Sequence, residues 1–278
     1  MSIPYDPSPP LVTPARLLAE QCQRLGVEPE DLALPQVLVG TFQGASYQRL
    51  IEVTGATQPR ARSDGTAIET GISIGELPTI EAGISIGKPP NGGQPLAVAR
   101  LPAGAPSAVL ALESAIARGV QSVLIVGSAG SLQPDLPMGS TVIVSDAVRE
   151  EGTSYHYVPG GVQVRADPEI VELLAGCARA AGLNPQIGSA WTTDAPLRET
   201  VGAVARHSSR GVKVVEMEAS AIFAVSQVRA VRAGLLVAVS DELFDTWRPG
   251  FLSEEYLQSL SKGIDIALEA AGQLMAWE

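Results

Sequence analysis

The stretch Val214-Val215-Glu216-Met217-Glu218-Ala219-Ser220 decides the fold, together with Val239-Ser240-Asp241-Glu242 later in the chain. In the first, two carboxylates lie where an apolar β-branched pair runs into an apolar segment, residues 221–225. The second ends the apolar run 234–240, which is typical of a buried parallel strand. Open α/β sheets bind their ligands at the carboxyl ends of such strands. The two stretches therefore predict an α/β fold with acidic side chains at a ligand site.

Length and composition predict one large soluble domain. The chain has 278 residues, of which 45% are hydrophobic and 18% are charged. No apolar run approaches the roughly 20 residues that span a bilayer. We place an N-terminal arm and helix in residues 1–35 and the main domain in residues 36–278. The N-terminus lacks the basic start and apolar core of a signal peptide, so we expect a cytoplasmic protein.

The charge of the chain and its cysteines argue against a nucleic-acid partner and a metal site. The net charge of −11 and the scattering of 19 Lys and Arg residues argue against a nucleic-acid backbone, which needs clustered cations. Cys22 and Cys177 have no neighbouring Cys or His at metal-ligand spacing. We therefore expect no metal site, no nucleic-acid partner and no membrane partner.

Strand-like and helix-like segments alternate along the chain, as in an α/β fold. The predicted strands are residues 36–40, 96–100, 122–126, 141–145, 186–191 and 234–240, and the predicted helices are residues 14–26, 107–118, 167–182 and 253–277. Thr13 and Ser253 are predicted helix caps. Residues 127–131, rich in Gly and Ser, are predicted to form a turn. The near-repeat of residues 68–75 in residues 80–87 is interpreted as a hairpin or a loop insertion.

Five motifs in this order resemble the nucleoside phosphorylase and nucleosidase superfamily. They are Gly127-Ser128-Ala129-Gly130, Glu150-Glu151-Gly152-Thr153-Ser154-Tyr155-His156-Tyr157, Thr193-Asp194, Val215-Glu216-Met217-Glu218-Ala219 and Ser240-Asp241. The superfamily includes purine nucleoside phosphorylases, uridine phosphorylases and methylthioadenosine nucleosidases. The resemblance covers roughly residues 36–270. It implies a single three-layer α/β/α domain with a mixed, partly barrel-like central sheet, and a homo-oligomer built from dimers, up to a hexamer.

The resemblance also implies roles for the acids of the opening stretches. Cleaving an N-glycosidic bond requires stabilisation of a cationic sugar and protonation of a poor leaving group. Glu218 would accept hydrogen bonds from the ribose hydroxyls and Met217 would pack on the sugar. Asp241 would hold or donate a proton at the purine N7, with help from Arg248. Glu216 either joins the ribose site, pairs with an arginine or caps a helix, and these three interpretations stay open.

Further residues complete the expected pocket. The resemblance and the residue types place Thr193, Asp194, Ser240 and Trp191 near the base, although Thr193 is also a plausible turn residue and Trp191 a core residue. His156 is a candidate for the pocket wall. Ser128 and Gly40 are expected on the side of the nucleophile. The competing interpretation for Glu218 and Asp241 is a buried salt bridge with a residue such as Arg248.

The chain departs from the superfamily where phosphate should bind. The segment Gly40-Thr41-Phe42-Gln43-Gly44 lacks the arginine that phosphorylases carry there, and Ile125 stands at the position of a second phosphate-binding arginine. Losing two charge-assisted contacts of ~1.5–3 kcal/mol each would weaken phosphate binding. Four arginines are candidates for rebuilding the anion site: Arg49, Arg60, Arg62 and Arg100.

The sequence therefore predicts a pentosyltransferase of nucleoside salvage. A nucleoside phosphorylase would cleave a nucleoside, preferentially a purine nucleoside, with phosphate as co-substrate and without another cofactor, giving free base and ribose 1-phosphate. Arg198 and Glu199 lie where uridine phosphorylases read a pyrimidine, so the base stays open. Because both phosphate-binding arginines are missing, a hydrolytic nucleosidase and a non-catalytic, nucleoside-binding member are the alternatives.

Overall fold

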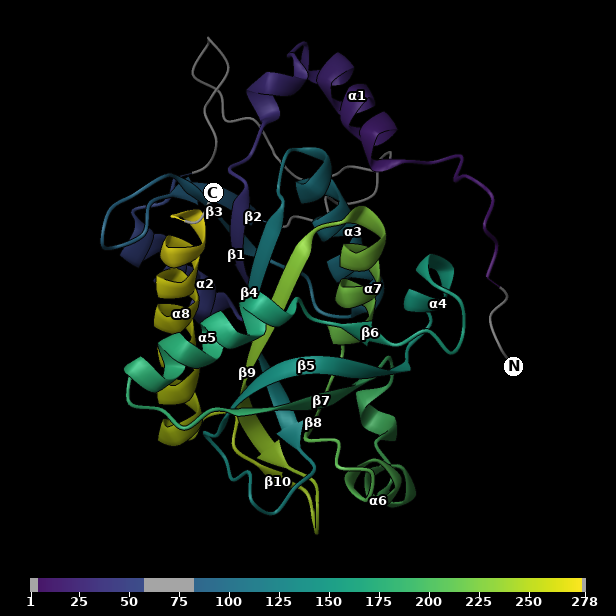
Figure 1. The fold of residues 1–278 in the computed structure, drawn as a ribbon, viewed down its shortest axis with the longest axis vertical. Coiled ribbons are helices and arrows are strands. Elements are labelled where there is room, and N and C mark those ends of the chain that lie inside the picture. The colour runs from purple at the N-terminus through teal and green to yellow at the C-terminus, as the bar shows by residue number, and fades with distance from the viewer. Residues whose placement is uncertain (1–4, 58–82, 277–278) are drawn as a thin grey trace.

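A computed structural model describes residues 5–57 and 83–276 (Figure 1). The helices of these segments are α1 (Pro14–Leu25), η1 (Pro29–Leu32), α2 (Gly44–Thr54), α3 (Ala105–Ala117), α4 (Ser154–Tyr157), α5 (Pro168–Ala180), η2 (Pro196–Arg198), α6 (Val201–Ser208), α7 (Ala219–Arg229) and α8 (Glu254–Met275). The strands are β1 (Val37–Thr41), β2 (Gly83–Gly87), β3 (Leu96–Arg100), β4 (Ser122–Ser131), β5 (Thr141–Glu150), β6 (Val164–Arg165), β7 (Gln186–Thr193), β8 (Val214–Glu216), β9 (Arg232–Glu242) and β10 (Arg248–Pro249).

The strands form one mixed sheet in the order β10-β9-β5-β7-β8-β4-β1-β3-β2, with β6 on β5. An additional parallel pairing joins β4 to β9, so β9, β5, β7, β8 and β4 close into a ring. Strands β1 and β3 continue from β4 as a parallel extension, and β2 pairs with β3 in the antiparallel direction. The predicted mixed and partly barrel-like sheet is confirmed.

Helices cover both sides of the sheet. Helix α8 contacts α5 and α2 and packs on β9, β4 and β1, while α3 and α7 contact each other and α7 packs on β5 (Figure 1). Strands that are covered on both faces must be apolar throughout. The run 233–239 of β9 is accordingly buried at every position. The three-layer α/β/α fold predicted from the sequence is therefore confirmed.

The helix caps agree with the sequence. The Thr13 side chain accepts a hydrogen bond from the Arg16 N–H at 3.2 Å, and that of Ser253 accepts from Tyr256 N at 3.2 Å. Asp167 caps α5, with Pro168 in the first turn. These side chains satisfy backbone N–H groups that the first turn of a helix leaves without a partner.

Three boundaries differ from the predictions. Residues 127–131 belong to β4 and form no turn, because Gly130 and Ser131 pair with β8 on one side and β9 on the other. Strand β5 runs on to Glu150, since its second half pairs with β7. Helix α3 begins at Ala105, two residues earlier than predicted, with Pro106 in its first turn. In each case tertiary pairing or a proline sets the boundary.

The near-repeat lies largely outside the described residues, although part of its second copy forms β2. No helix in residues 5–57 and 83–276 is long and apolar enough to cross a membrane.

Candidate functional site

The two acidic stretches include strand β8 and the end of strand β9, which flank the end of β4 on its two sides. Gly130 pairs with Val215 of β8 in the antiparallel direction and with Asp241 of β9 in the parallel direction. A register shift between Ala129 and Gly130 accompanies this double pairing. The topology thereby brings Glu216 and Glu218, at the end of β8, and Asp241, at the end of β9, to one edge of the ring.

Gly130 fits this position because it lacks a side chain. A Cβ atom there would lie 2.3 Å from Leu243 Cδ1, 3.2 Å from Val215 Cγ1 and 3.4 Å from Asp241 Oδ2. The first of these distances is far inside van der Waals contact. A side chain at this residue would therefore require Leu243 to move and would crowd Val215 between the two strands.

Glu216 caps α7. Its Oε2 accepts hydrogen bonds from the backbone N–H groups of Glu218 and Ala219, both at 2.7 Å. Its Oε1 accepts from Thr192 Oγ1 at 2.6 Å. With both oxygens engaged, Glu216 orients the backbone at the start of α7, which supports the capping interpretation; its direct ribose contact stays a prediction.

A buried polar chain continues from Glu216. Thr192 Oγ1 accepts from the Ser220 N–H at 3.0 Å, and Ser220 Oγ donates to Glu151 Oε1 at 2.8 Å. The second oxygen of Glu151 accepts from Ser154 N at 2.9 Å. This chain ties the motif beginning at Glu150 to the start of α7. Glu151, Thr192 and Ser220 thus have structural roles in the site.

Backbone hydrogen bonds with Gly104 and Met217 act on the Glu218 carboxylate. Oε1 accepts a hydrogen bond of 2.6 Å from the backbone N–H of Gly104, in the loop between β3 and α3. Only 7% of Glu218 is exposed. Burial, followed by the charge of Glu216, raises the pKa of Glu218 to about 8. Burial also raises the pKa of Glu216 to about 7, against the effect of its hydrogen bonds. Met217 lies half-buried between the two acids.

Asp241 has a different environment. Ser240 Oγ lies 2.7 Å from Asp241 Oδ1 and 3.2 Å from the carbonyl oxygen of Ala129. The indole Nε1 of Trp247 donates to Asp241 Oδ2 at 2.9 Å. Asp241 is 7% exposed. Glu199 is close enough for the charge of Asp241 to add to the effect of burial, which raises the pKa of Glu199 to about 7.

Arg248 does not reach Asp241. Its guanidinium lies 3.1 Å from Glu242 Oε2 and 3.8 Å from Asp245 Oδ2. The backbone explains this, because Arg248 is the register partner of Glu242, whereas Pro249 is the partner of Asp241. The alternative salt bridge between Arg248 and Asp241 is therefore wrong, and the assistance of Asp241 by Arg248 stays a prediction that no contact in this structure supports.

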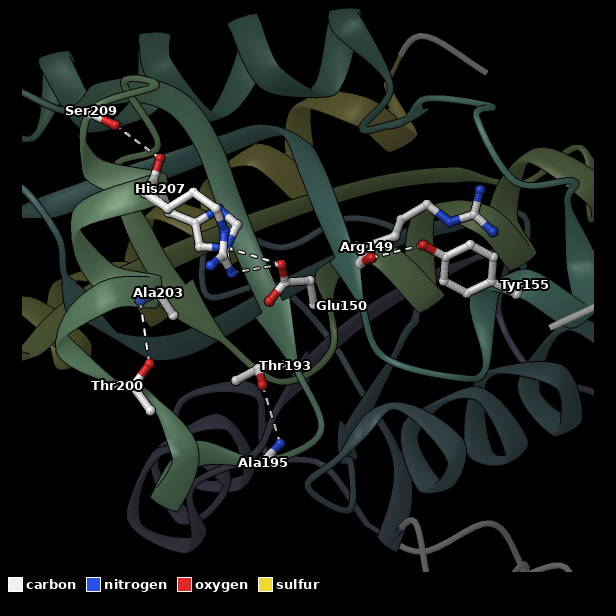
Figure 2. A network of polar contacts seen from close by, with 10 residues as sticks. Arg149, Glu150, Tyr155, Thr193, Ala195, Thr200, Ala203, His207 and Ser209 are labelled. Atoms are coloured by element: carbon white, nitrogen blue, oxygen red, sulfur yellow. Dashed lines mark hydrogen bonds and ion pairs between the residues drawn. The ribbon is translucent and has the colours of Figure 1, made fainter. Parts of the chain in front are cut away.

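Trp191 belongs to the protein core. It is 2% exposed and stacks on His207 of α6, with ring centroids 4.4 Å apart. Figure 2 shows that Glu150 in turn reaches this histidine, with 3.2 Å between Oε1 and Nε2. Because side chains alternate across a strand, Trp191 and its neighbour Thr192 point to opposite faces of β7. The core interpretation of Trp191 replaces the base-pocket prediction.

The remaining base-side residues lie at the end of β7. Thr193 is buried, and its Oγ1 accepts from the Ala195 N–H at 3.2 Å (Figure 2). Asp194 is exposed and accepts from Gly152 N at 2.9 Å. His156 is exposed on α4. Asp194 thus connects two loops, and His156 gains no support as a pocket wall.

The nucleophile side gathers polar groups around Ser128. Gln43 Nε2 donates to Ser128 Oγ at 2.8 Å, and Thr41 Oγ1 donates to Gln43 Oε1 at 3.0 Å. Burial raises the pKa of Tyr256, a hydrogen bond with Ser128 opposes the rise, and the charge of Asp241 adds to it. Tyr256 therefore lies near both Ser128 and Asp241.

Gly40 has a packing role. It lies inside β1, paired with Ala99 and Ile125, and a Cβ atom there would be 3.1 Å from Leu101 Cδ1. The anion-binding role expected of Gly40 gains no support from this position. Within residues 5–57 and 83–276, no three His, Cys, Asp or Glu side chains gather as they would around a metal ion.

Sequence reasoning missed four contributors to the site: Gln43, Gly104, Trp247 and Tyr256. Gln43, Gly104 and Tyr256 come from segments outside the motifs, whereas Trp247 follows the Ser240-Asp241 motif on the next loop; in each case the tertiary fold brings the group to the site. The one available signal was Gly104-Ala105-Pro106 after a strand, which is typical of a turn into a helix.

Comparisons with known proteins show the family of this chain. A family model described as the Phosphorylase superfamily matches residues 68–271, more than half of the chain. Guanosine phosphorylase of Halorubrum lacusprofundi is 29% identical over 157 residues, which cover 56% of this chain and 65% of that protein. Uridine phosphorylase of Haemophilus influenzae is 29% identical over 148 residues, which cover 48% of this chain and 59% of that protein. The chain thus spans less than two thirds of the length of either relative.

The fold has a match among solved structures. Purine nucleoside phosphorylase from Toxoplasma gondii, in complex with immucillin-H, aligns with a TM-score of 0.73 and 18% sequence identity. The alignment covers 91% of this chain and 95% of that chain. At this identity the likeness establishes the fold.

Proposed function

Because this chain belongs to the phosphorylase superfamily, we propose that it cleaves the N-glycosidic bond of a nucleoside with phosphate. The products are free base and ribose 1-phosphate, which makes the protein a pentosyltransferase. The observation that carries the proposal is the double pairing of Gly130 with Val215 and Asp241. Two strand spacings separate Val215 from Asp241 across β4 by roughly 10 Å. Glu218 follows three residues after Val215, so the arrangement suits a sugar at Glu218 and its base at Asp241.

The two acids divide the chemistry. The Glu218 carboxylate, positioned by the Gly104 N–H, accepts hydrogen bonds from the ribose hydroxyls and holds the sugar as it becomes cationic. Asp241 shares or transfers a proton at the base as the glycosidic bond breaks. Glu216 fixes the position of Glu218 through the start of α7. Ser128 is assigned to the side from which the nucleophile approaches.

A purine is the proposed base. A carboxyl group beside the base can protonate a ring nitrogen, and purines offer N7 for this, whereas pyrimidines lack an equivalent atom. The half-buried Glu199 beside Asp241 adds an acceptor for ring N–H groups. The relatives include both a guanosine and a uridine phosphorylase, so substrate trials must cover both classes.

Arg100 is the proposed phosphate ligand. Of the four candidate arginines, Arg60 and Arg62 lie outside the described residues, and Arg49 pairs with Asp265 at 2.6 Å. Arg100 ends β3 opposite Thr41. Its guanidinium atoms lie 3.5–3.7 Å from where a Cβ of Gly44 would be, so it packs against the start of α2. A guanidinium there supplies the charge that the segment 40–44 lacks.

The deciding experiment incubates the purified protein with inosine, guanosine, adenosine, methylthioadenosine and uridine, each with and without phosphate. Base release that requires phosphate supports the proposal, and ribose 1-phosphate must then appear in equal amount. Release without phosphate identifies a hydrolase instead. Binding of bases without any cleavage identifies a non-catalytic member.

The anion site has its own test. Replacing Arg100 by Met should raise the KM for phosphate about 10- to 100-fold, which corresponds to one lost charge-assisted contact. Arg49→Met is the matched control, because its guanidinium is bound to Asp265, and its KM for phosphate should stay at the wild-type value. Equal phosphate KM values for both variants would remove Arg100 from the site.

Assembly and location stay predictions. A homo-oligomer built from dimers and a cytoplasmic role in nucleoside salvage follow from the sequence, and light scattering of the purified chain measures the first.

A further inference from the structure

The loop after β9 returns an exposed aromatic side chain to the buried acid. Trp247 is 61% exposed, yet its indole Nε1 donates to Asp241 Oδ2 at 2.9 Å. The loop is short, because β9 ends at Glu242 and β10 begins at Arg248 as its antiparallel partner. An indole N–H can only donate, so this contact fits an acceptor oxygen of Asp241.

Trp247 lies where a ligand base would meet Asp241. The other oxygen, Oδ1, faces Ser240 Oγ at 2.7 Å, inside the protein. Oδ2 is the oxygen nearer to Gly130, on the strand between the two acids. A base that bonds to Oδ2 must therefore approach the atom that the indole N–H now contacts. The indole and the base compete for, or share, the same carboxylate edge.

Another aromatic partner for the base is missing from the neighbouring segment. The residues after Thr193-Asp194 are Ala195, Pro196 and Leu197, all exposed and none of them aromatic. Trp191 is committed to the opposite face of β7, against His207. In the described part of the chain, two side chains lie at hydrogen-bond distance from the carboxylate oxygens of Asp241, those of Ser240 and Trp247. Trp247 is the one that carries an aromatic ring.

We propose that Trp247 is a substrate-contacting residue that recognises a planar heteroaromatic base: its N–H yields Asp241 Oδ2 to the base and its ring packs on the base. This inference rests on the proposed function of the same site. Moving the indole away from Asp241 requires little disruption of the core, because most of the Trp247 side chain is already exposed. Base-to-aromatic stacking is worth about 1–3 kcal/mol, which corresponds to roughly a 10- to 100-fold change in affinity.

Binding measurements on the full chain test the proposal. Hypoxanthine, guanine and uracil are titrated while tryptophan fluorescence is recorded, and the dissociation constants are checked by calorimetry. A bound base should change the emission of the wild-type protein, and this change should disappear in Trp247→Phe. Trp247→Ala should raise the base dissociation constant and the nucleoside KM about 10- to 100-fold, with a smaller effect on kcat. Trp247→Phe keeps a ring and should lose less than about 5-fold.

Leu252→Ala is the matched control, since Leu252 is an 89% exposed apolar side chain on the following loop. It should bind bases like the wild type. A wild-type dissociation constant and KM in Trp247→Ala, or an unchanged fluorescence response in Trp247→Phe, would overturn the proposal. Base binding needs no turnover, so the two proposals fail separately. Trp247-dependent base binding without cleavage refutes only phosphorolysis, and cleavage that ignores Trp247 refutes only this inference.

Discussion

Three acids of similar burial have three different sets of partners. Glu216 accepts from two backbone N–H groups and a threonine, so its oxygens are used within the protein. Glu218 accepts from the backbone N–H of Gly104, a backbone hydrogen bond with Met217 also acts on it, and no side chain in the described part of the chain is hydrogen-bonded to it. Asp241 accepts from an exposed indole that can move. At this scale, the number and kind of hydrogen-bond donors distinguish the capping acid Glu216 from Glu218 and Asp241, for which we propose functional roles.

Replacing Asp241 by Asn should lower kcat/KM for purine nucleosides about 10²- to 10⁴-fold, because an amide cannot transfer a proton to the base. Steady-state phosphorolysis of inosine measures this. Asp135→Asn, at an exposed side chain, is the control and should retain wild-type kinetics. Wild-type turnover in Asp241→Asn would exclude proton transfer by this residue.

Replacing Glu216 by Ala should destabilise the protein by about 1–3 kcal/mol, because two N–H groups at the start of α7 and the Thr192 hydroxyl lose their acceptor. Urea denaturation followed by circular dichroism provides the measurement. Glu172→Ala, at a 72% exposed side chain of α5, should change stability by less than about 0.5 kcal/mol. Similar effects of the two substitutions would contradict the capping role.

At the scale of elements, β4 places the site. It is the strand that pairs with β8, β9 and β1, and its last residues lie between the two acidic stretches. The spacing between Val215 and Asp241 is therefore a property of strand pairing, with a glycine at the shared position of β4.

Gly130→Ala should lower both stability and activity. The added methyl group would overlap Leu243, so we expect a loss of about 1–3 kcal/mol in unfolding free energy and a fall of at least about tenfold in kcat/KM. Gly176→Ala is the matched control, because a Cβ at this position inside α5 would meet no other atom within 4 Å. An alanine there should stabilise the helix by about 0.5–1 kcal/mol without affecting kinetics. Normal kinetics in Gly130→Ala would show that the spacing of the strands tolerates the methyl group.

At the scale of the whole molecule, closure of the ring buries carboxylates whose pKa values are raised. Glu216 and Glu218 have pKa values of about 7 and about 8, compared with an ordinary value of 4.5. The folded protein therefore keeps protons that the unfolded chain has released. Such groups stabilise the fold fully below pH 4.5, and this contribution is lost as the pH rises through 7 and 8.

Stability should accordingly fall between about pH 6.5 and about pH 8.5, by on the order of 1–3 kcal/mol. His207, whose pKa is lowered by burial from its ordinary value of 6.5, acts in the opposite direction, because as the pH rises through the lower part of this window the unfolded chain still releases a proton that the folded protein does not hold. Urea denaturation at several pH values measures the slope. Glu218→Gln should flatten it, whereas a slope identical to that of the wild type would exclude Glu218 as a source.

Local sequence features predicted much of the fold. Apolar runs bounded by Gly, Pro and capping residues located the helices and strands, because hydrophobic periodicity and caps act within a few residues. The spacing of Glu218 and Asp241 indicated the acids, and the absence of arginine from residues 40–44 and from position 125 is plain in the sequence. These features depend on neighbours in the chain.

Long-range pairing decided the rest. The strand register, and no local signal, directs Arg248 to Glu242 and leaves Asp241 to the indole of Trp247. The alternation of β7 sends Trp191 away from the pocket, toward α6. Gly104, Gln43 and Tyr256 reach the site from three separate elements. The sequence by itself determined which acids are present and on which strands they end. The tertiary structure decided which donors face each acid, because hydrogen bonds act over about 3 Å between segments that lie far apart in the chain.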